Sequence, residues 1–241
     1  MRAEPDRRQR LLQLAAGAAF LAIAAVVVLI VINSSNGSGG DTKIEGVAEV
    51  NRLLNGIPQE GLFLGNFKKG VPVELIEYGD LQCPVCKGYA EEILPPIIEG
   101  PVKRGEAALE FRNYAIIGPQ SLPAGAAAIA AGEQGRGWYF LELFYRNQGE
   151  ENSGYADDAF LKALAKAAGV KDMKKWNSDR AQLTDYVEHT TQRAEQLGFE
   201  GTPTFATAHP TSPDLKVLGT PGSTGALEDA IKEAAEETGA G

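Results

Sequence analysis

Residues 79–86 read GDLQCPVC, and this stretch decides how the rest of the chain is interpreted. The run before it, VPVELIEY at 71–78, is rich in β-forming residues and predicts a central strand that is covered on both faces. The run after it, KGYAEEILPPII at 87–98, predicts a helix that Pro95 and Pro96 kink or end. Two cysteines separated by two residues, between a strand and a helix, predict thiol redox chemistry.

The chain contains only two cysteines, Cys83 and Cys86. A disulfide that closes a loop of about four residues stabilises a fold by ~2 kcal/mol, against ~4.7 kcal/mol for a loop of a hundred. A disulfide between these two cysteines would therefore stabilise the fold only slightly, and a role in thiol redox chemistry explains the pair better. At the start of a helix, unpaired N–H groups and the positive dipole end favour a thiolate, which is the nucleophile in disulfide exchange. We therefore expect Cys83 to attack, and Cys86, one turn later and more buried, to resolve the mixed disulfide.

Two other interpretations of the cysteine pair are weaker. A zinc site usually needs four ligands, and only His189 and His209 could add to the two thiols. Neither histidine has ligand spacing to the cysteines, so both are expected to be ordinary surface or core residues. A redox-silent pair of small core residues is the other possibility. We therefore expect no metal and no cofactor.

The composition limits the kinds of partner. The chain has 241 residues, enough for one domain or two small ones, and it is 44% hydrophobic and 23% charged, as is ordinary for a globular protein. Its formal net charge is -9. Nucleic-acid binding needs a basic surface, so no nucleic-acid partner is expected. The simplest meaning of the acidity is solubility.

The N-terminal part predicts a membrane anchor. Residues 11–32 are apolar apart from Gln13, and a helix of this length spans roughly 33 Å, about the hydrocarbon core of a bilayer. Four arginines lie within residues 1–10, and the next basic residue is Lys43. The positive-inside rule therefore places residues 1–10 in the cytoplasm and residues 33–241 outside it.

A cleaved signal peptide is the main alternative to the anchor, although its apolar region is usually shorter and the Asn33-Ser34-Ser35 that follows is a weak cleavage site. A twin-arginine signal fits less well. Residues 33–42 read NSSNGSGGDT and predict a flexible linker with a reach of roughly 17–19 Å. The remaining residues, 43–241, are expected to form the catalytic domain.

Alternating strand and helix signals predict an α/β domain with a helical insertion at about 119–199. Strands are expected at residues 61–64, 71–78, 108–114, 204–207 and 216–218. Helices are expected at 44–55, 87–98, 124–135 and 138–147, from a cap at Asp157 or Asp158 to Gly169, from Ser178 to Leu197, and at the C-terminus with Leu227, Ile231 and Ala235 on one face. The strands on either side of the CxxC helix should pair in parallel, and the last two strands can form a hairpin.

Residues 61–241 resemble the DsbA-like branch of the thioredoxin superfamily. The segments that carry this resemblance are YGDLQCPVCKGYAEEILP, ALEFRNYAIIG, GEQGRGWYFLELFYRNQGEENSG and GFEGTPTF. The resemblance implies a thioredoxin-like fold, with Cys83 as nucleophile and Cys86 as resolving cysteine. It also implies that Thr202 and Pro203 form a cis-proline loop that faces the cysteines and binds substrate. The family's buried acid, six residues before the first cysteine, maps onto Glu77, which would relay a proton from Cys86 unless its carboxylate reaches solvent.

Three further features of the sequence leave alternatives open. Asp80 is expected to be a turn residue rather than an acid–base group. The dipeptide between the cysteines is Pro84-Val85, whereas strongly oxidising members of the family often carry a histidine there, so the oxidising strength is in question. An aromatic cluster would either pack in the core or line a substrate groove; it comprises Trp138, Tyr139, Phe140, Phe144 and Tyr145.

The resemblance and the expected anchor together imply an extracytoplasmic thiol–disulfide oxidoreductase that donates disulfides to reduced secreted or envelope proteins. Such an enzyme needs reoxidation by a membrane partner with a quinone-linked dithiol. A reductase or isomerase in the same compartment is the alternative enzyme. A non-catalytic binding protein, either a chaperone-like tether or a metallochaperone, is the alternative from another class. The reduction potential of the Cys83–Cys86 pair is the measurement that separates the first two.

Overall fold

The computed structural model describes residues 42–66, 72–209 and 214–237 of the chain. Lys43–Gly241 form one unit of the fold. The predicted anchor at residues 11–32, the segment 1–10 and nearly all of the predicted linker lie outside the described residues. Among the residues that are described, no helix has the length and apolar character needed to cross a membrane.

The described elements alternate as an α/β domain with an insertion of helices. The strands are β1 (Gln59–Glu60), β2 (Phe63–Leu64), β3 (Val73–Gly79), β4 (Ala107–Asn113), β5 (Thr204–Ala208) and β6 (Leu215–Gly219). The α-helices are α2 (Val47–Leu54), α3 (Pro84–Gly88), α4 (Leu94–Ile97), α5 (Ser121–Gly132), α6 (Gly137–Arg146), α7 (Asp158–Ala167), α8 (Met173–Arg180), α9 (Thr184–Gln196) and α10 (Thr224–Glu237), and two π-helical segments are η2 (Tyr89–Ile93) and η3 (Ile98–Val102).

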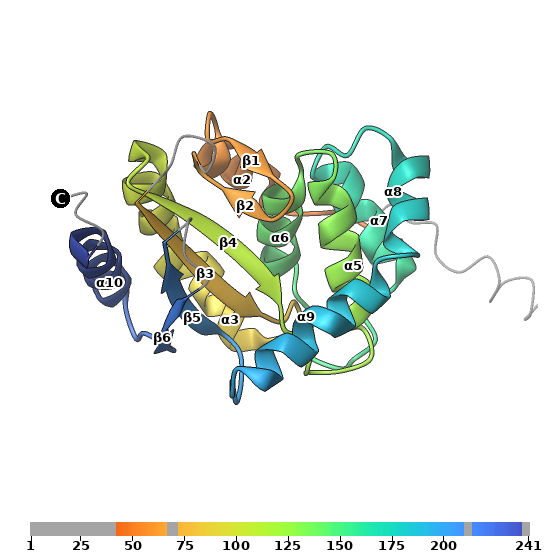
Figure 1. The fold of residues 1–241 in the computed structure, drawn as a ribbon. Coiled ribbons are helices and arrows are strands. Elements are labelled where there is room, and N and C mark those ends of the chain that lie inside the picture. The colour runs from red at the N-terminus through yellow and green to blue at the C-terminus, as the bar shows by residue number, and fades with distance from the viewer. Residues whose placement is uncertain (1–41, 67–71, 210–213, 238–241) are drawn as a thin grey trace, which may run out of the picture. The chain divides into compact units, whose positions relative to one another are not determined.

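The strands form one sheet in the order β1-β2-β4-β3-β5-β6 (Figure 1). β3 lies in its middle, parallel to β4, with Val73 opposite Ala107 and Gly79 opposite Asn113. β3 pairs antiparallel with β5, and β5 pairs antiparallel with β6. The structure therefore contains the parallel pair and the C-terminal hairpin that the sequence predicts.

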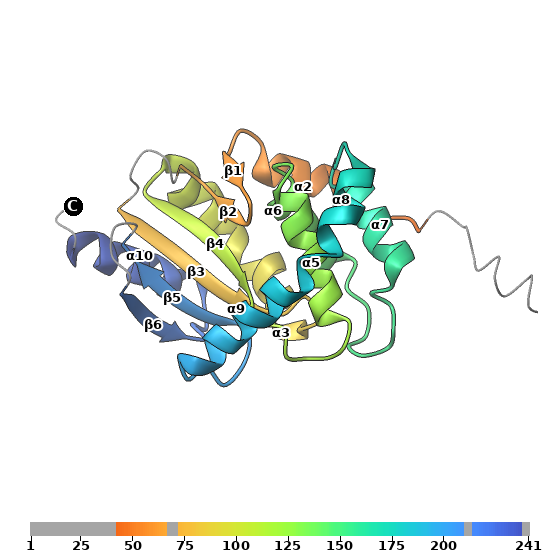
Figure 2. The same ribbon diagram turned by 45° about the vertical axis from the view of Figure 1, so that its right-hand side comes forward.

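Both faces of β3 are covered, which explains its nearly continuous apolar sequence. Leu75 faces the larger core, together with the CxxC segment and Leu227 of α10. Ile76 faces a smaller core that includes Ala194 of α9 and Phe199. Helices α5 to α9 gather at the end of β3 where α3 begins (Figures 1 and 2). The helical insertion is thus placed next to the cysteines.

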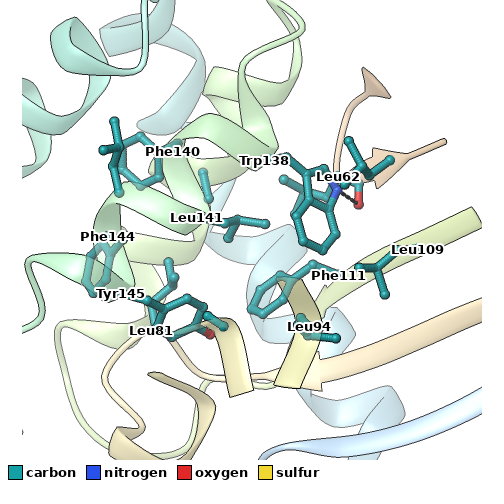
Figure 3. Close-up of a cluster of buried hydrophobic side chains, with 14 of the residues drawn as sticks. Leu62, Leu81, Leu94, Leu109, Phe111, Trp138, Phe140, Leu141, Phe144 and Tyr145 are labelled. Atoms are coloured by element: carbon teal, nitrogen blue, oxygen red, sulfur yellow. Dashed lines mark hydrogen bonds between the residues drawn. The ribbon is translucent and has the colours of Figure 1, made fainter. Parts of the chain in front are cut away.

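Helix α6 supplies much of the core near the cysteines. Trp138, Phe140, Phe144 and Tyr145 are buried (Figure 3). Tyr145 reaches the turn before the cysteines through a hydrogen bond to the Asp80 carbonyl oxygen, whereas Phe144 packs against Tyr155 and Phe160 of the insertion. The indole Nε1 of Trp138 donates a hydrogen bond of 2.9 Å to the Leu62 carbonyl oxygen. For these four residues the structure supports core packing, one of the two interpretations of the aromatic cluster, whereas Tyr139 is half-buried with the Arg136 guanidinium over its ring.

The helix after the cysteines does not end at Pro95 and Pro96. These residues lie in the first turn of α4, where the missing proline N–H costs little. The preceding segment η2 closes wider turns, in which the Leu94 N–H reaches the carbonyl of Tyr89, five residues back. The prolines are therefore accommodated by a change of turn type, and helical structure continues through η3, with Gly100 outside helical geometry.

Two expected elements differ from those observed. The expected helix from Ser178 to Leu197 is wrong, because α8 ends at Arg180 and α9 begins at Thr184. No glycine or proline marks this break, which separates the part that packs through Trp176 onto α5 from the part that packs through Val187 and Ala194. The expected strand at 61–64 is confirmed only in its second half, which is β2, whereas residues 61–62 form the turn between β1 and β2.

Candidate active site

Cys83 lies where β3 has ended and helix α3 begins. It is the N-cap residue, with extended backbone angles, and Pro84 occupies the first helical position. The Sγ of Cys83 accepts a hydrogen bond of 3.4 Å from the backbone N–H of Cys86 and donates one of 3.3 Å to the carbonyl oxygen of Thr202. Both cysteines are free thiols in this structure. The strand–turn–helix sequence thus directs the first sulfur toward the Thr202–Pro203 loop.

The surroundings of Cys83 stabilise its thiolate. The pKa of the Cys83 thiol is lowered to about 6, chiefly by its hydrogen bond with the Cys86 side chain. The hydroxyl of Thr202 and the backbone N–H groups of Cys86 and Val85 lower it further, whereas burial opposes the shift. Val85 therefore contributes through its backbone, and its side chain adds no charge.

The second cysteine has the opposite character. Cys86 is fully buried, and its pKa is raised well above the usual thiol value. Burial is the main cause, followed by the hydrogen bond with Cys83 and the negative charge of Glu77. At neutral pH the negative charge of the pair therefore resides on Cys83, while Cys86 keeps its proton.

The peptide bond between Thr202 and Pro203 is cis, and Pro203 is buried. The loop is held in place from both sides, since Thr204 Oγ1 donates to the Gly201 carbonyl at 2.8 Å and Thr220 Oγ1 to the Pro203 carbonyl at 2.9 Å. The buried Thr202 Oγ1 has no hydrogen-bond partner in the thiol form described here. It is thus available to donate to a thiolate on Cys83.

We predict that Thr202→Val raises the pKa of Cys83 while the fold is retained, because the substitution preserves shape and removes one donor. A rise of about one unit would lower the reduction potential of the pair by about 30 mV. Iodoacetamide labelling against pH and a glutathione equilibrium measure the two quantities. Thr220→Val is the matched control, because its hydroxyl contacts the same loop but not the sulfur. Equal pKa values in the Thr202 variant and the natural chain would contradict the role of the hydroxyl.

Glu77 lies on β3 and is buried, with 1% of its surface exposed, so its carboxyl does not reach solvent at the strand end. Its pKa is raised to about 8 by burial first, then by the charges of Glu142 and Cys83. Within the described part of the chain, its Oε1 atom has no hydrogen-bond partner. A carboxyl with this pKa next to Cys86 is able to exchange a proton near neutral pH.

Asp80 is a turn residue, as expected from the sequence, rather than an acid–base group. Its Oδ1 accepts a hydrogen bond of 2.8 Å from the Gln82 N–H, and its Oδ2 accepts bonds of 2.8 Å from the N–H groups of Ile116 and Ile117. The buried carboxylate therefore joins the turn before the cysteines to the loop after β4. All of its bonds stabilise backbone geometry.

Polar residues of the insertion hold this turn in place, and no sequence motif predicts them. Gln148 Nε2 donates to the carbonyl oxygens of Leu81 at 2.7 Å and Cys83 at 3.1 Å. Gln82 Nε2 donates to Ser121 Oγ at 3.0 Å. The only signal in the sequence was that Gln82 lies between the turn and the first cysteine, a position where its side chain becomes completely buried.

The two histidines lie away from the cysteines. His189 belongs to α9, which covers the opposite face of the sheet, and its side chain is exposed. His209 follows β5 at the Glu74 end of β3, whereas Cys83 follows the Gly79 end. Neither histidine therefore joins the thiols.

The thioredoxin family model matches residues 59–211, which include the CxxC helix, the helical insertion and the cis-proline loop. The chain belongs to the thioredoxin family. The expected membership of its DsbA-like branch and the expected enzyme class, protein disulfide oxidoreductase, are both confirmed.

Among curated relatives, this thioredoxin-family chain is 27% identical over 154 residues to the probable disulfide bond formation protein D of Bacillus cereus, covering 61% of this chain and 71% of that protein. It is 26% identical to disulfide bond formation protein D of Bacillus subtilis, covering 57% of this chain and 64% of that protein.

Among solved structures, oxidised BdbD from Bacillus subtilis superposes with a TM-score of 0.64 at 21% identity, covering 75% of this chain and 98% of that chain. Wolbachia pipientis alpha-DsbA1 superposes with a TM-score of 0.61 at 20% identity, covering 78% and 97%. These two likenesses support the fold.

Proposed function

We propose that the chain forms disulfides in reduced secreted or envelope proteins by dithiol–disulfide exchange, with Cys83 as nucleophile and Cys86 as resolving cysteine. The observation that supports the proposal is that the pKa values of the two thiols are shifted in opposite directions, downward for Cys83 and upward for Cys86. A thiol with a pKa of about 6 is ionised about thirtyfold more than a free cysteine at pH 7. The relatives are named disulfide bond formation proteins, which supports the proposal that this chain oxidises its substrates.

Substrate oxidation begins with the disulfide form of the pair. A substrate thiolate attacks Cys83 Sγ, the bond between the two cysteines breaks, and Cys86 leaves with the electron pair and takes a proton from Glu77. A second substrate thiolate then attacks the mixed disulfide at the substrate sulfur, so that Cys83 leaves as a stabilised thiolate. The substrate gains a disulfide and loses two electrons to the chain.

Reoxidation reverses these steps with a different partner. The Cys83 thiolate attacks a disulfide of the partner, Cys86 gives its proton to Glu77, and the Cys86 sulfur then displaces the partner's thiolate from Cys83. The two electrons pass to the partner, for which we propose a membrane protein with a quinone-linked dithiol. Thr202 and Pro203 supply the loop on which a substrate peptide lies beside Cys83, with the Thr202 backbone available to pair with an extended peptide.

The proposed location is outside the cytoplasm, with residues 11–32 as a single membrane anchor and residues 1–10 inside. We predict that a reporter that is active only outside the cytoplasm retains its activity when it is fused after Gly241, because the arginines of residues 1–10 favour this orientation. Activity of a strictly cytoplasmic reporter at the same site would contradict the topology. Mass spectrometry that finds cleavage after residue 32 would remove the anchor.

The proposed direction of electron flow is tested by refolding a reduced, unfolded substrate such as ribonuclease with the oxidised chain. We expect ribonuclease activity to recover faster with the oxidised chain than with oxidised glutathione alone, because Cys83 leaves as a thiolate with a low pKa. Refolding of scrambled ribonuclease without net oxidation would favour the isomerase alternative. Reduction of insulin without any oxidation of substrate would favour a reductase, and stoichiometric binding without turnover would favour a binding protein.

A further inference from the structure

Three buried polar atoms on β3 and α6 have no hydrogen-bond partner among the residues that the structure describes: Oε1 of Glu77, Oε2 of Glu142 and Nε of Arg146. Glu142 is only 2% exposed. Arg146 follows it by one helical turn, with NH2 3.6 Å from Glu142 Oε2, which is close enough for an ion pair and too long for a good hydrogen bond. A buried carboxyl oxygen without a donor is costly unless its carboxyl holds a proton.

The two carboxyls affect each other. After burial, the charge of Glu142 is the largest cause of the raised pKa of Glu77, about 8. Burial raises the pKa of Glu142 to about 7 although Arg146 opposes the shift. Two buried carboxyls that repel each other do not ionise together, so at neutral pH the pair retains a proton.

The pair has one end at the cysteines and the other near solvent. On the inner side, the charge of Glu77 raises the pKa of Cys86. On the outer side, the side chain of Arg146 is 23% exposed, and the exposed Glu91 of η2 acts electrostatically on Glu142. Glu142 is thus a buried acid that interacts electrostatically with the inner carboxyl and, on the other side, with charged groups that meet water.

The charges around Glu142 are few. In the described part of the chain, the fully buried charged side chains are Glu77, Asp80 and Glu142, and Asp80 is fully occupied by backbone donors. Helix α2 packs on α6 through apolar residues, while its Glu49 and Arg52 pair in solvent. On α7, Asp158 and Lys162 pair with each other in solvent. From α3, Lys87 is half-buried, and on α6 the phenol of Tyr145 donates to the Asp80 carbonyl.

From this arrangement we propose that Glu142 is a positioning residue that holds a proton for Glu77 and passes it between Cys86 and solvent. The inference rests on the proposed function, in which Cys86 loses and regains a proton. The only sign of Glu142 in the sequence is that it is the one acidic residue in an otherwise largely apolar stretch of α6.

The proton step accompanies the sulfur chemistry. During reoxidation Cys86 gives its proton to the Glu77 carboxylate as its sulfur bonds to Cys83 Sγ and the partner leaves as a thiolate with two electrons. Glu142, which holds the proton that the pair retains, releases it to water beside Arg146, and Glu77 then passes its own proton to the Glu142 carboxylate. During substrate oxidation the proton enters by the same carboxyls and ends on the Cys86 thiolate.

The test uses the reduced full chain and 5,5′-dithiobis(2-nitrobenzoate), followed by stopped-flow absorbance from pH 5 to pH 9. Cys83 releases the first thionitrobenzoate, and displacement by Cys86 releases the second, so the two phases report the two sulfurs separately. We expect Glu142→Gln to leave the first phase unchanged and to lower the limiting rate of the second phase about tenfold. Its pH midpoint should fall, since loss of the Glu142 charge lowers the pKa of Glu77.

Matched variants separate this role from a structural one. Glu142→Asp should restore part of the second-phase rate, whereas Glu92→Gln, which removes an exposed acid of η2, should change neither phase. A second phase in Glu142→Gln with the natural rate and midpoint, together with altered thermal stability, would overturn the proposal and leave Glu142 as a structural ion pair.

Three further measurements keep the outcome decidable. If Glu142→Gln does not fold, ¹³C NMR titration of the carboxyl carbons in the unaltered chain should show two coupled titrations near neutral pH. Titration of both carbons near the ordinary glutamate pKa would overturn the proposal. If Glu77→Gln slows the second phase and Glu142→Gln does not, the inference fails and the proposed function stands. Release of the second thionitrobenzoate by Cys86→Ala would instead refute the division of roles between the cysteines.

Discussion

Cys83→Ala is expected to abolish disulfide exchange, whereas Cys86→Ala is expected to accumulate mixed disulfides with substrates. Loss of the attacking sulfur should lower the rate of exchange by roughly a thousandfold or more, as is usual when a nucleophile is removed. Loss of Cys86 leaves the attack intact but removes the only sulfur that is positioned to resolve the adduct. Non-reducing electrophoresis after acid quenching, with a reduced client protein, distinguishes the two outcomes.

The trapping variant should also show how much Cys86 stabilises the thiolate. The hydrogen bond with the Cys86 side chain is the largest cause of the low pKa of Cys83, so this pKa should rise in Cys86→Ala. Iodoacetamide labelling of Cys83 against pH measures it. In Cys83→Ala, by contrast, Cys86 should resist labelling because its thiol is fully buried. Equal reactivity of the two remaining thiols would refute the division of labour between them.

The parts of the fold that the sequence predicts correctly are those governed by local rules. The strand VELIEYG and the turn to α3 combine apolar residues, a buried turn acid and a proline at the first helical position. Helix α7 begins where expected, because the Asp157 carboxylate accepts the Phe160 N–H at 2.8 Å. Such signals act within a few residues and are therefore visible without a structure.

The break between α8 and α9 shows what local rules miss. Residues 181–183 include neither glycine nor proline. The break separates two packing contacts, since the Trp176 indole donates to the Ala127 carbonyl at 3.0 Å, while α9 packs against the sheet through Ala194. Packing partners far apart in the chain therefore override helix propensity here.

The site residues divide in the same way. The cysteines and Pro203 belong to motifs, and a single sequence suffices to find them. Gln148 and Glu142 lie in the helical insertion, and their relation to the cysteines depends on how α6 packs against α3 and η2. A polar residue in an amphipathic helix gives no sign of whether it is buried against a reactive thiol or exposed to water.

The reduction potential of the pair is expected to lie between those of thioredoxin, near -270 mV, and DsbA, near -120 mV. A low pKa of Cys83 stabilises the reduced form, which makes the disulfide oxidising. The side chain of Val85 is 52% exposed and adds neither charge nor hydrogen bond, so the extreme oxidising value is not expected. Val85→His should raise the potential by adding a partner for the thiolate. Equilibration with glutathione buffers measures both values.

The same thiols make the stability of the reduced form depend on pH, and the sign follows from the two pKa shifts. Unfolded cysteine has a pKa of about 8.5, so between about 6 and 8.5 the folded Cys83 is ionised while the unfolded one holds its proton, and folding becomes more favourable as pH rises. Above about 8.5 the unfolded chain loses both thiol protons whereas folded Cys86 keeps its own, so this gain reverses.

The oxidised form has neither thiol, so the difference in unfolding midpoint between the two forms isolates their contribution. We expect the reduced form to be the more stable at neutral pH. Its advantage should grow from pH 6 to about pH 8.5 and then decline, because the Cys86 proton is retained only in the folded state. Denaturant titrations of both forms at half-unit pH steps measure the difference. A potential at or below that of thioredoxin, with the oxidised form more stable throughout, would make the chain a reductase.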